Sequence, residues 1–126
     1  MPLVTISMRS GKTEEYRGAI MDGVHAALHE TFSMPQDNGF MVINEIDAPN
    51  FRYSRNYFDI LRSDVLVIVQ ISAINSRSAD QKKALYKRMV DNLAKAPGLR
   101  PEDLFVNITE GEKENWSLGY GLAQYT

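Results

Sequence analysis

The spacing of apolar side chains changes twice along the first third of the chain. Residues 2–8 alternate between two faces, which predicts a β-strand that begins at a proline. Thr13 then offers an N-cap, and apolar residues recur at three- and four-residue steps, which predicts an α-helix that ends before Pro35. Residues 40–45 predict a second strand. The helical stripe consists of Tyr16, Ile20, Val24, Ala27, Leu28 and Thr31.

The same order of patterns returns in the second half of the chain. Residues 64–72 are nearly continuous in apolar, β-branched side chains, which is typical of a strand buried on both faces. Ser78 and Gln81 match a capping box and predict the start of a second helix. Residues 104–110 predict a last strand. The inner face of the second helix is marked by Leu85, Met89 and Leu93.

These patterns predict two tandem β-α-β units, at about residues 2–45 and 64–110, within one domain that spans residues 1–126. Right-handed crossovers make the two strands of each unit parallel. Two such units side by side give an α+β or α/β fold, with a four-stranded mixed sheet and both helices on one face. The other face is then apolar and uncovered, which predicts an oligomer.

Two segments fall outside these units: an arm at residues 46–63 and a C-terminal tail at residues 111–126. Aromatic side chains and arginines are interleaved in the arm, and such mixtures can bind single-stranded nucleic acid by stacking. The net charge of −2 opposes that function. We therefore expect a short hairpin arm that packs its aromatic residues on the body or on a neighbouring subunit. These residues are Phe51, Tyr53, Tyr57 and Phe58, with Arg52, Arg55 and Arg62.

The composition and the apolar runs indicate the cellular compartment in which the protein works. The chain contains no cysteine, which excludes disulfides and thiolate chemistry and fits a reducing compartment. No apolar run approaches the roughly 20 residues that span a bilayer. The first residues lack the basic-then-apolar order of a signal peptide. We therefore expect a cytoplasmic protein that binds neither nucleic acid nor membranes.

Pro2 is the first candidate for chemistry. Removal of Met1 would make it a secondary amine at the end of a rigid strand. The pKa of α-amino groups is about 7.7–8.0, so a modest decrease leaves such an amine largely neutral near pH 7. Burial and nearby cations both lower this pKa. A neutral amine can act as a general base or as an imine-forming nucleophile, whereas the alternative is a proline that only begins a strand.

Three segments together carry a family resemblance. The chain opens with Met-Pro-Leu-Val, residues 75–78 are Asn-Ser-Arg-Ser, and residues 115–121 are Asn-Trp-Ser-Leu-Gly-Tyr-Gly. This set resembles the tautomerase superfamily, in its longer-chain branch that includes malonate semialdehyde decarboxylase. The resemblance covers essentially the whole chain in order. It implies a homotrimer and a cofactor-free enzyme that acts on small carboxylate substrates.

Arg77 lies in the loop between the strand at residues 64–72 and the second helix. Open α/β sheets place ligands at such loops, and a guanidinium there could hold a carboxylate with two hydrogen bonds. A solvated surface arginine is the alternative. The resemblance implies a substrate-binding arginine at this place and so a catalytic role for Arg77. Decarboxylases of the family carry a second arginine two residues earlier, where this chain has Asn75. Asn75 is therefore a further candidate for substrate binding.

The turn before the second strand holds two further candidates. The family's decarboxylases place an acid in this turn, and the aligned residue here is Asn38, which cannot act as a base. Asp37 could take the role if the turn is shifted, and the alternative for both residues is ordinary turn chemistry. Trp116 and Leu118 match the family's tail, which implies that they help to wall the pocket. An apolar wall favours the neutral form of Pro2.

The two histidines do not indicate a metal site. His25 and His29 are four residues apart on the first helix and could share a metal ion in principle. No third ligand is apparent nearby, and the two-histidine-and-glutamate pattern of zinc enzymes is absent. We therefore expect neither a metal nor another cofactor.

Three functions remain open at this point. The expected function is keto–enol tautomerisation of small 2-oxo or enol carboxylates, with Pro2 carrying a proton between carbon and oxygen. Decarboxylation or hydration of the malonate semialdehyde type is the rival within enzymes, and the missing second arginine weakens it. A non-catalytic oligomeric binding module is the rival from another class. A free Pro2 amine separates the two enzymes from the binding module.

Overall fold

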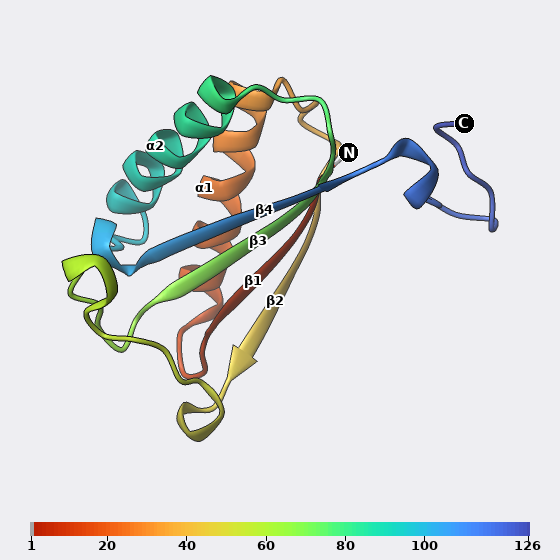
Figure 1. Cartoon of the computed structure of the whole chain (residues 1–126). Coiled ribbons are helices and arrows are strands. Elements are labelled where there is room, and N and C mark those ends of the chain that lie inside the picture. The colour runs from red at the N-terminus through yellow and green to blue at the C-terminus, as the bar shows by residue number, and fades with distance from the viewer. Residues whose placement is uncertain (1) are drawn as a thin grey trace.

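The computed structural model describes residues 2–126 and contains the two predicted β-α-β units (Figure 1). The first unit consists of β1 (Leu3–Arg9), α1 (Glu14–Phe32) and β2 (Phe40–Ile46). The second consists of β3 (Val67–Ile74), α2 (Ala79–Lys95) and β4 (Leu104–Gly111). Within residues 2–126, no helix combines the length and the apolar character needed to cross a membrane.

The four strands form one mixed sheet in the order β2-β1-β3-β4. The strands of each unit are parallel, and the antiparallel pair of β1 and β3 joins the two units. Leu3 sets the register at one end, because it pairs with Phe40 on β2 and with Ser72 on β3. Both helices cover the same face of the sheet (Figure 1). The predicted fold class is therefore confirmed.

Both helices begin where the sequence predicts. The Thr13 side chain accepts a hydrogen bond from the backbone N–H of Tyr16 at 3.1 Å. Ser78 and Gln81 form the complete capping box. After α1, Ser33 adopts a left-handed conformation with φ of 57°, which turns the chain out of the helix. Local chemistry within three or four residues thus places the helix ends.

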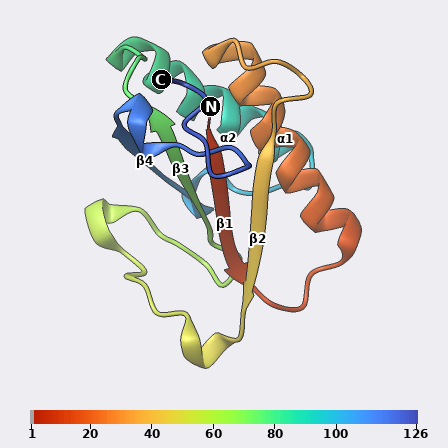
Figure 2. The ribbon, with the colours of Figure 1, turned by 90° about the vertical axis from the view of Figure 1, so that its right-hand side faces the viewer.

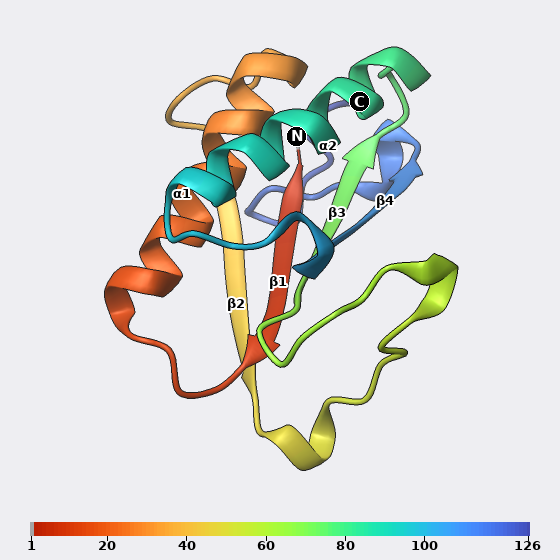
Figure 3. The same cartoon turned by 90° about the vertical axis from the view of Figure 1, so that its left-hand side faces the viewer.

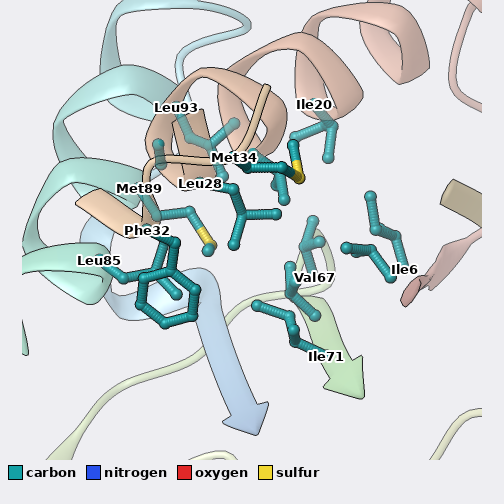
Figure 4. Packing of buried hydrophobic residues seen from close by; sticks show 14 of the residues in the cluster. Ile6, Ile20, Leu28, Phe32, Met34, Val67, Ile71, Leu85, Met89 and Leu93 are labelled. Atoms are coloured by element: carbon teal, nitrogen blue, oxygen red, sulfur yellow. The ribbon is translucent and has the colours of Figure 1, made fainter. Parts of the chain in front are cut away.

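The core lies between the helices and the sheet. α1 and α2 approach closely at Gly23, where an added Cβ would lie 2.7 Å from Leu93 Cδ2. Asn92 Nδ2 also donates a hydrogen bond to the Gly23 carbonyl at 3.1 Å. A larger residue at this position would therefore push the helices apart. Figure 4 shows core side chains from both layers, including Ile6, Ile20, Leu28, Phe32, Met34, Val67, Ile71, Leu85, Met89 and Leu93.

The sheet face away from the helices is open in the single chain. β3 begins only at Val67, because residues 64–65 form a turn, and Gln70 and Ser72 on this strand are exposed. The prediction of a strand buried on both faces is therefore wrong for the single chain. Its alternating polar residues mark a strand with one covered face. Large exposed apolar side chains on the open face are Leu3, Phe40, Val42 and Phe105.

The arm at residues 46–63 contains two short 3₁₀ turns, Ala48–Asn50 and Tyr57–Asp59. The Arg62 backbone N–H donates to the Arg55 carbonyl at 2.9 Å, and this bond closes the arm in place of paired strands. Along the described chain between β2 and β3 no strand is present, so the predicted hairpin of paired strands is not formed. Phe58 and Asp59 both have positive φ and turn the chain within the arm. Figures 2 and 3 show the arm at the end of the sheet away from the N-terminus.

Candidate active site

One end of the sheet gathers the segments that carry the predicted chemistry. The N-terminal ends of β1 and β2 meet the C-terminal ends of β3 and β4 there, beside the C-terminal tail (Figures 1 and 2). A pocket of about 540 Å³ lies at this end. Strand ends and the tail both contribute to its lining, which includes Pro2, Leu3, Phe40, Glu110, Trp116 and Leu118.

Pro2 is buried in the wall of this pocket. Its position follows from Leu3, which is held between β2 and β3 by the sheet register. Phe40 and Trp116 contribute apolar surface to the same pocket. An apolar environment disfavours a protonated amine, so these walls would lower the pKa of a free Pro2 amine.

The tail that carries Trp116 and Leu118 has its own internal hydrogen bonds. The Leu118 backbone N–H donates to Gln124 Oε1, and Gln124 Nε2 donates to the Gly119 carbonyl, both at 2.8 Å. Gly119 and Gly121 have φ of 152° and 69°, in the left-handed region that favours glycine. The two glycines of the tail motif therefore allow the turn that Gln124 stabilises.

The structure brings three of the predicted site residues together in the pocket wall: Pro2, Trp116 and Leu118. Asn75 does not line the pocket. Its backbone N–H donates to the carbonyl of Gly111, a lining residue, at 3.0 Å. The loop before α2 is thereby tied to the pocket end of β4, while the predicted substrate contact of Asn75 stays a prediction.

Arg77, Asp37 and Asn38 do not line the pocket of the single chain. The Arg77 guanidinium lies over the Phe32 ring, 4.8 Å from its centroid, and Nη2 lies 3.4 Å from the Phe32 carbonyl oxygen. The Asn38 backbone N–H donates to the Pro35 carbonyl at 3.1 Å, which closes the turn, and Asp37 is exposed. The substrate contacts of these three residues stay predictions.

Glu110 is a lining residue that the sequence patterns do not single out. Its carboxylate Oε1 lies 2.5 Å from Nζ of Lys82 on α2. One signal could have found it, because Val106 and Ile108 occupy the inward positions of β4 and Glu110 is the next inward residue. A charged side chain at an inward strand position needs a partner, and that partner is Lys82.

The two histidines contact the protein itself. His29 Nδ1 lies 2.5 Å from the Met34 carbonyl oxygen. The His25 ring lies against Gly39, where an added Cβ would be 3.0 Å from Nδ1. Among the described residues 2–126, no three His, Asp or Glu side chains are grouped so that they could hold a metal ion.

Comparison with known proteins identifies the family. A family model described as "Tautomerase enzyme" matches residues 38–119, and a second model with the same description matches residues 2–54. The chain belongs to the tautomerase family. The probable tautomerase YusQ of Bacillus subtilis (strain 168) is 33% identical over 124 residues, which cover 98% of each chain. The family resemblance predicted from the N-terminal and tail motifs is confirmed.

Solved structures of malonate semialdehyde decarboxylase share the tautomerase fold of this chain. One, inhibited by 3-bromopropiolate, has a TM-score of 0.91 at 30% identity, and the match covers 98% of this chain and 93% of that chain. Another set of wild-type, mutant and inactivated forms gives a TM-score of 0.91 at 23% identity, with 98% and 95% covered. These relatives thus match 98% of this chain.

Proposed function

We propose that this tautomerase interconverts the keto and enol forms of small 2-oxo carboxylates without a cofactor. Its general base is the Pro2 amine, which becomes free when Met1 is removed. The observation that carries the proposal is the burial of Pro2 in the wall of a pocket of about 540 Å³. An amine at this position can reach a small substrate, while apolar walls from Phe40 and Trp116 disfavour its protonated form.

The proposed reaction moves one proton. The neutral Pro2 amine takes it from the carbon next to the substrate carbonyl. The electron pair of that C–H bond forms the C=C bond, and the carbonyl π electrons move onto oxygen. The Pro2 ammonium group then gives the proton to this oxygen, which yields the enol and restores the neutral amine. The reverse order of steps converts the enol into the ketone.

Arg77 supplies the positive charge for the substrate carboxylate, or polarises the carbonyl, in this proposal. This role requires its guanidinium to leave the Phe32 ring, over which it lies in the single chain. We assign further substrate contacts to Asn75, Asp37 and Asn38, which lie in the loops at the same end of the sheet.

The working assembly in this proposal is a homotrimer. Its support is the open sheet face with exposed Phe40, Val42 and Phe105. Burial of apolar surface of this kind in an interface with copies of the same chain is favourable.

Decarboxylation or hydration of a malonate semialdehyde type substrate is a second candidate. The 30% identity to a malonate semialdehyde decarboxylase over 98% of the chain favours it. Asn75 and Asn38 stand against it, since they replace the arginine and the acid that the decarboxylase resemblance implies. A non-catalytic binding module follows if Met1 is retained, because the nitrogen of Pro2 is then a tertiary amide and no base.

Two parallel assays test the proposal on protein whose N-terminus is established by intact-mass measurement. One follows keto–enol conversion of phenylpyruvate, and the other follows release of carbon dioxide from malonate semialdehyde. We expect conversion of phenylpyruvate by protein that lacks Met1. Activity in the second assay alone would make the decarboxylase the better assignment. Inactivity in both assays with Pro2 free would leave the binding module.

A further inference from the structure

One acidic residue lines the pocket that is proposed to bind an anionic substrate. Glu110 lines it together with Pro2, and the exposed fraction of the Glu110 side chain is only 19%. Among the lining residues of the described chain, Glu110 has the only acidic or basic side chain. An unpaired negative charge there would repel a carboxylate substrate and would favour the protonated form of a free Pro2 amine.

Glu110 and Pro2 lie at the same end of the sheet with one strand between them. Glu110 pairs with Ala73 on β3, and Leu3, which follows Pro2, pairs with Ser72 on the same strand. Neighbouring strands are about 4.8 Å apart, which puts the backbones of Pro2 and Glu110 about 10 Å apart.

Lys82 on α2 neutralises this carboxylate. Its Nζ lies 2.5 Å from Glu110 Oε1, and the exposed fraction of its side chain is 26%. The pair is more sheltered from water than the Lys87–Asp91 pair on the same helix, whose side chains are 75% and 44% exposed. Sheltered charges are screened less by salt and water, so the state of this pair affects the pocket more strongly. The capping box that begins at Ser78 holds this turn of α2 in place.

We propose that Lys82 is a positioning residue of the active site, which acts by holding Glu110 in an ion pair and so allows the pocket to admit an anionic substrate. This inference rests on the carboxylate substrate of the proposed function and adds a residue from outside the pocket lining. Other charges at this end of the sheet are Asp37 in the loop before β2, Arg77 in the loop before α2 and the exposed side chains of residues 112–114 in the tail.

The Lys82→Gln variant leaves the negative charge of Glu110 without its partner. Two unit charges about 10 Å apart at an effective dielectric constant of about 20 change each other's pKa by roughly one unit, which corresponds to about tenfold in binding. We therefore expect the KM for phenylpyruvate to rise about tenfold. The acid limb of the profile of kcat/KM against pH should also move up by about one pH unit, because the unpaired carboxylate favours protonated Pro2.

A second substitution separates charge from structure. Glu110→Gln combined with Lys82→Gln should restore the KM and the acid limb, since the pocket again carries no net charge. Lys87→Gln, which removes an exposed lysine from the same helix, should leave both unchanged. The methyl ester of phenylpyruvate carries no carboxylate, so its KM should not respond to Lys82→Gln. A double variant that keeps the raised KM, or a Glu110→Gln variant that loses kcat, would overturn the inference.

A binding measurement tests the role of Lys82 independently of the proposed reaction. Titration calorimetry with 3-phenylpropanoate needs no turnover, and Lys82→Gln should weaken its binding about tenfold while the double variant restores it. Wild-type protein that binds this carboxylate but leaves phenylpyruvate unchanged would refute the tautomerase reaction alone. Equal dissociation constants for wild type and Lys82→Gln, or no binding by the wild type, would overturn the role of Lys82.

Discussion

Ser63 donates two hydrogen bonds to the carboxylate of Asp103, from its backbone N–H to Oδ1 and from its hydroxyl to Oδ2, both at 2.7 Å. Asp103 is fully buried just before β4, and the Tyr53 hydroxyl donates to the Ser63 carbonyl on the other side. The last residue of the arm is therefore fixed to the start of β4. This link holds the arm at the end of the sheet opposite the pocket.

Asp103→Ala should lower the free energy of unfolding by about 3 kcal/mol, because two donors of Ser63 then lose a charged acceptor. Urea denaturation followed by circular dichroism measures this difference. Asp22→Ala, at an exposed position on α1, is the matched control and should change stability by less than about 0.5 kcal/mol. Equal effects of the two substitutions would show that Asp103 does not anchor the arm.

Tyr16 should make stability fall at alkaline pH. Burial, and after it the charge of Asp103, raises the pKa of Tyr16 above its ordinary value of 10.0. The folded state therefore keeps the phenol proton where the unfolded state has lost it, so stability is full below pH 10 and decreases as pH rises further. Unfolding experiments between about pH 9 and pH 11 should show a flatter decrease for Tyr16→Phe. Tyr120→Phe, at a fully exposed position, should retain the wild-type slope.

Pro2 should give the reaction a single acid limb. Activity on phenylpyruvate rises with pH as the Pro2 amine loses its proton and reaches a plateau near neutrality, because the apolar pocket lowers the pKa of the amine. Pro2→Ala retains a terminal amine and should keep part of the activity. The measurement is a pH–rate profile on protein without Met1. Protein that is N-acetylated or retains Met1 serves as the control, and an undiminished rate in that control would exclude Pro2 as the base.

Arg77→Ala should weaken carboxylate binding by about 1.5–3 kcal/mol, the range for a hydrogen bond to a charged group. Steady-state kinetics with phenylpyruvate should show this as a raised KM. The contact of Arg77 with Phe32 predicts an additional small loss of stability, which thermal unfolding detects. Arg88→Ala, from the exposed pair with Glu30, is the control on α2. A loss of stability with an unchanged KM would mean that Arg77 only holds the end of α1.

Phe105→Glu should dissociate the expected homotrimer, since it introduces a charge on the open face of the sheet, where Phe105 is 45% exposed. Size-exclusion chromatography with light scattering should give a trimer for the wild type and a monomer for the variant. Tyr86→Glu, on the outer side of α2, should leave the assembly unchanged. A wild-type monomer at working concentration would refute the assembly.

By itself, the sequence determined the elements and their order. Apolar periods near 3.6 and 2 predict helices and strands because each element buries one face. Thr13 and Ser78 mark the helix starts through hydrogen bonds that reach only three residues along the chain. The opening Met-Pro-Leu-Val and the tail motif indicated the family, because each is a short run of neighbouring residues that can be recognised without knowing the fold. The apolar run at residues 64–72 misled, since composition alone does not say which face of a strand is covered.

Only the tertiary structure decided which distant residues meet. Lys82 and Glu110 are 28 residues apart, Ser63 and Asp103 are 40 apart, and Phe32 and Arg77 are 45 apart. Each contact depends on strand order and register, because a shift of one residue would turn Glu110 to the opposite face of the sheet. The apolar pattern of one strand does not show which other strands lie beside it in the sheet. The Lys82–Glu110 ion pair therefore follows from the packing of α2 against the sheet, and the pocket lining follows from the strand order and the course of the tail.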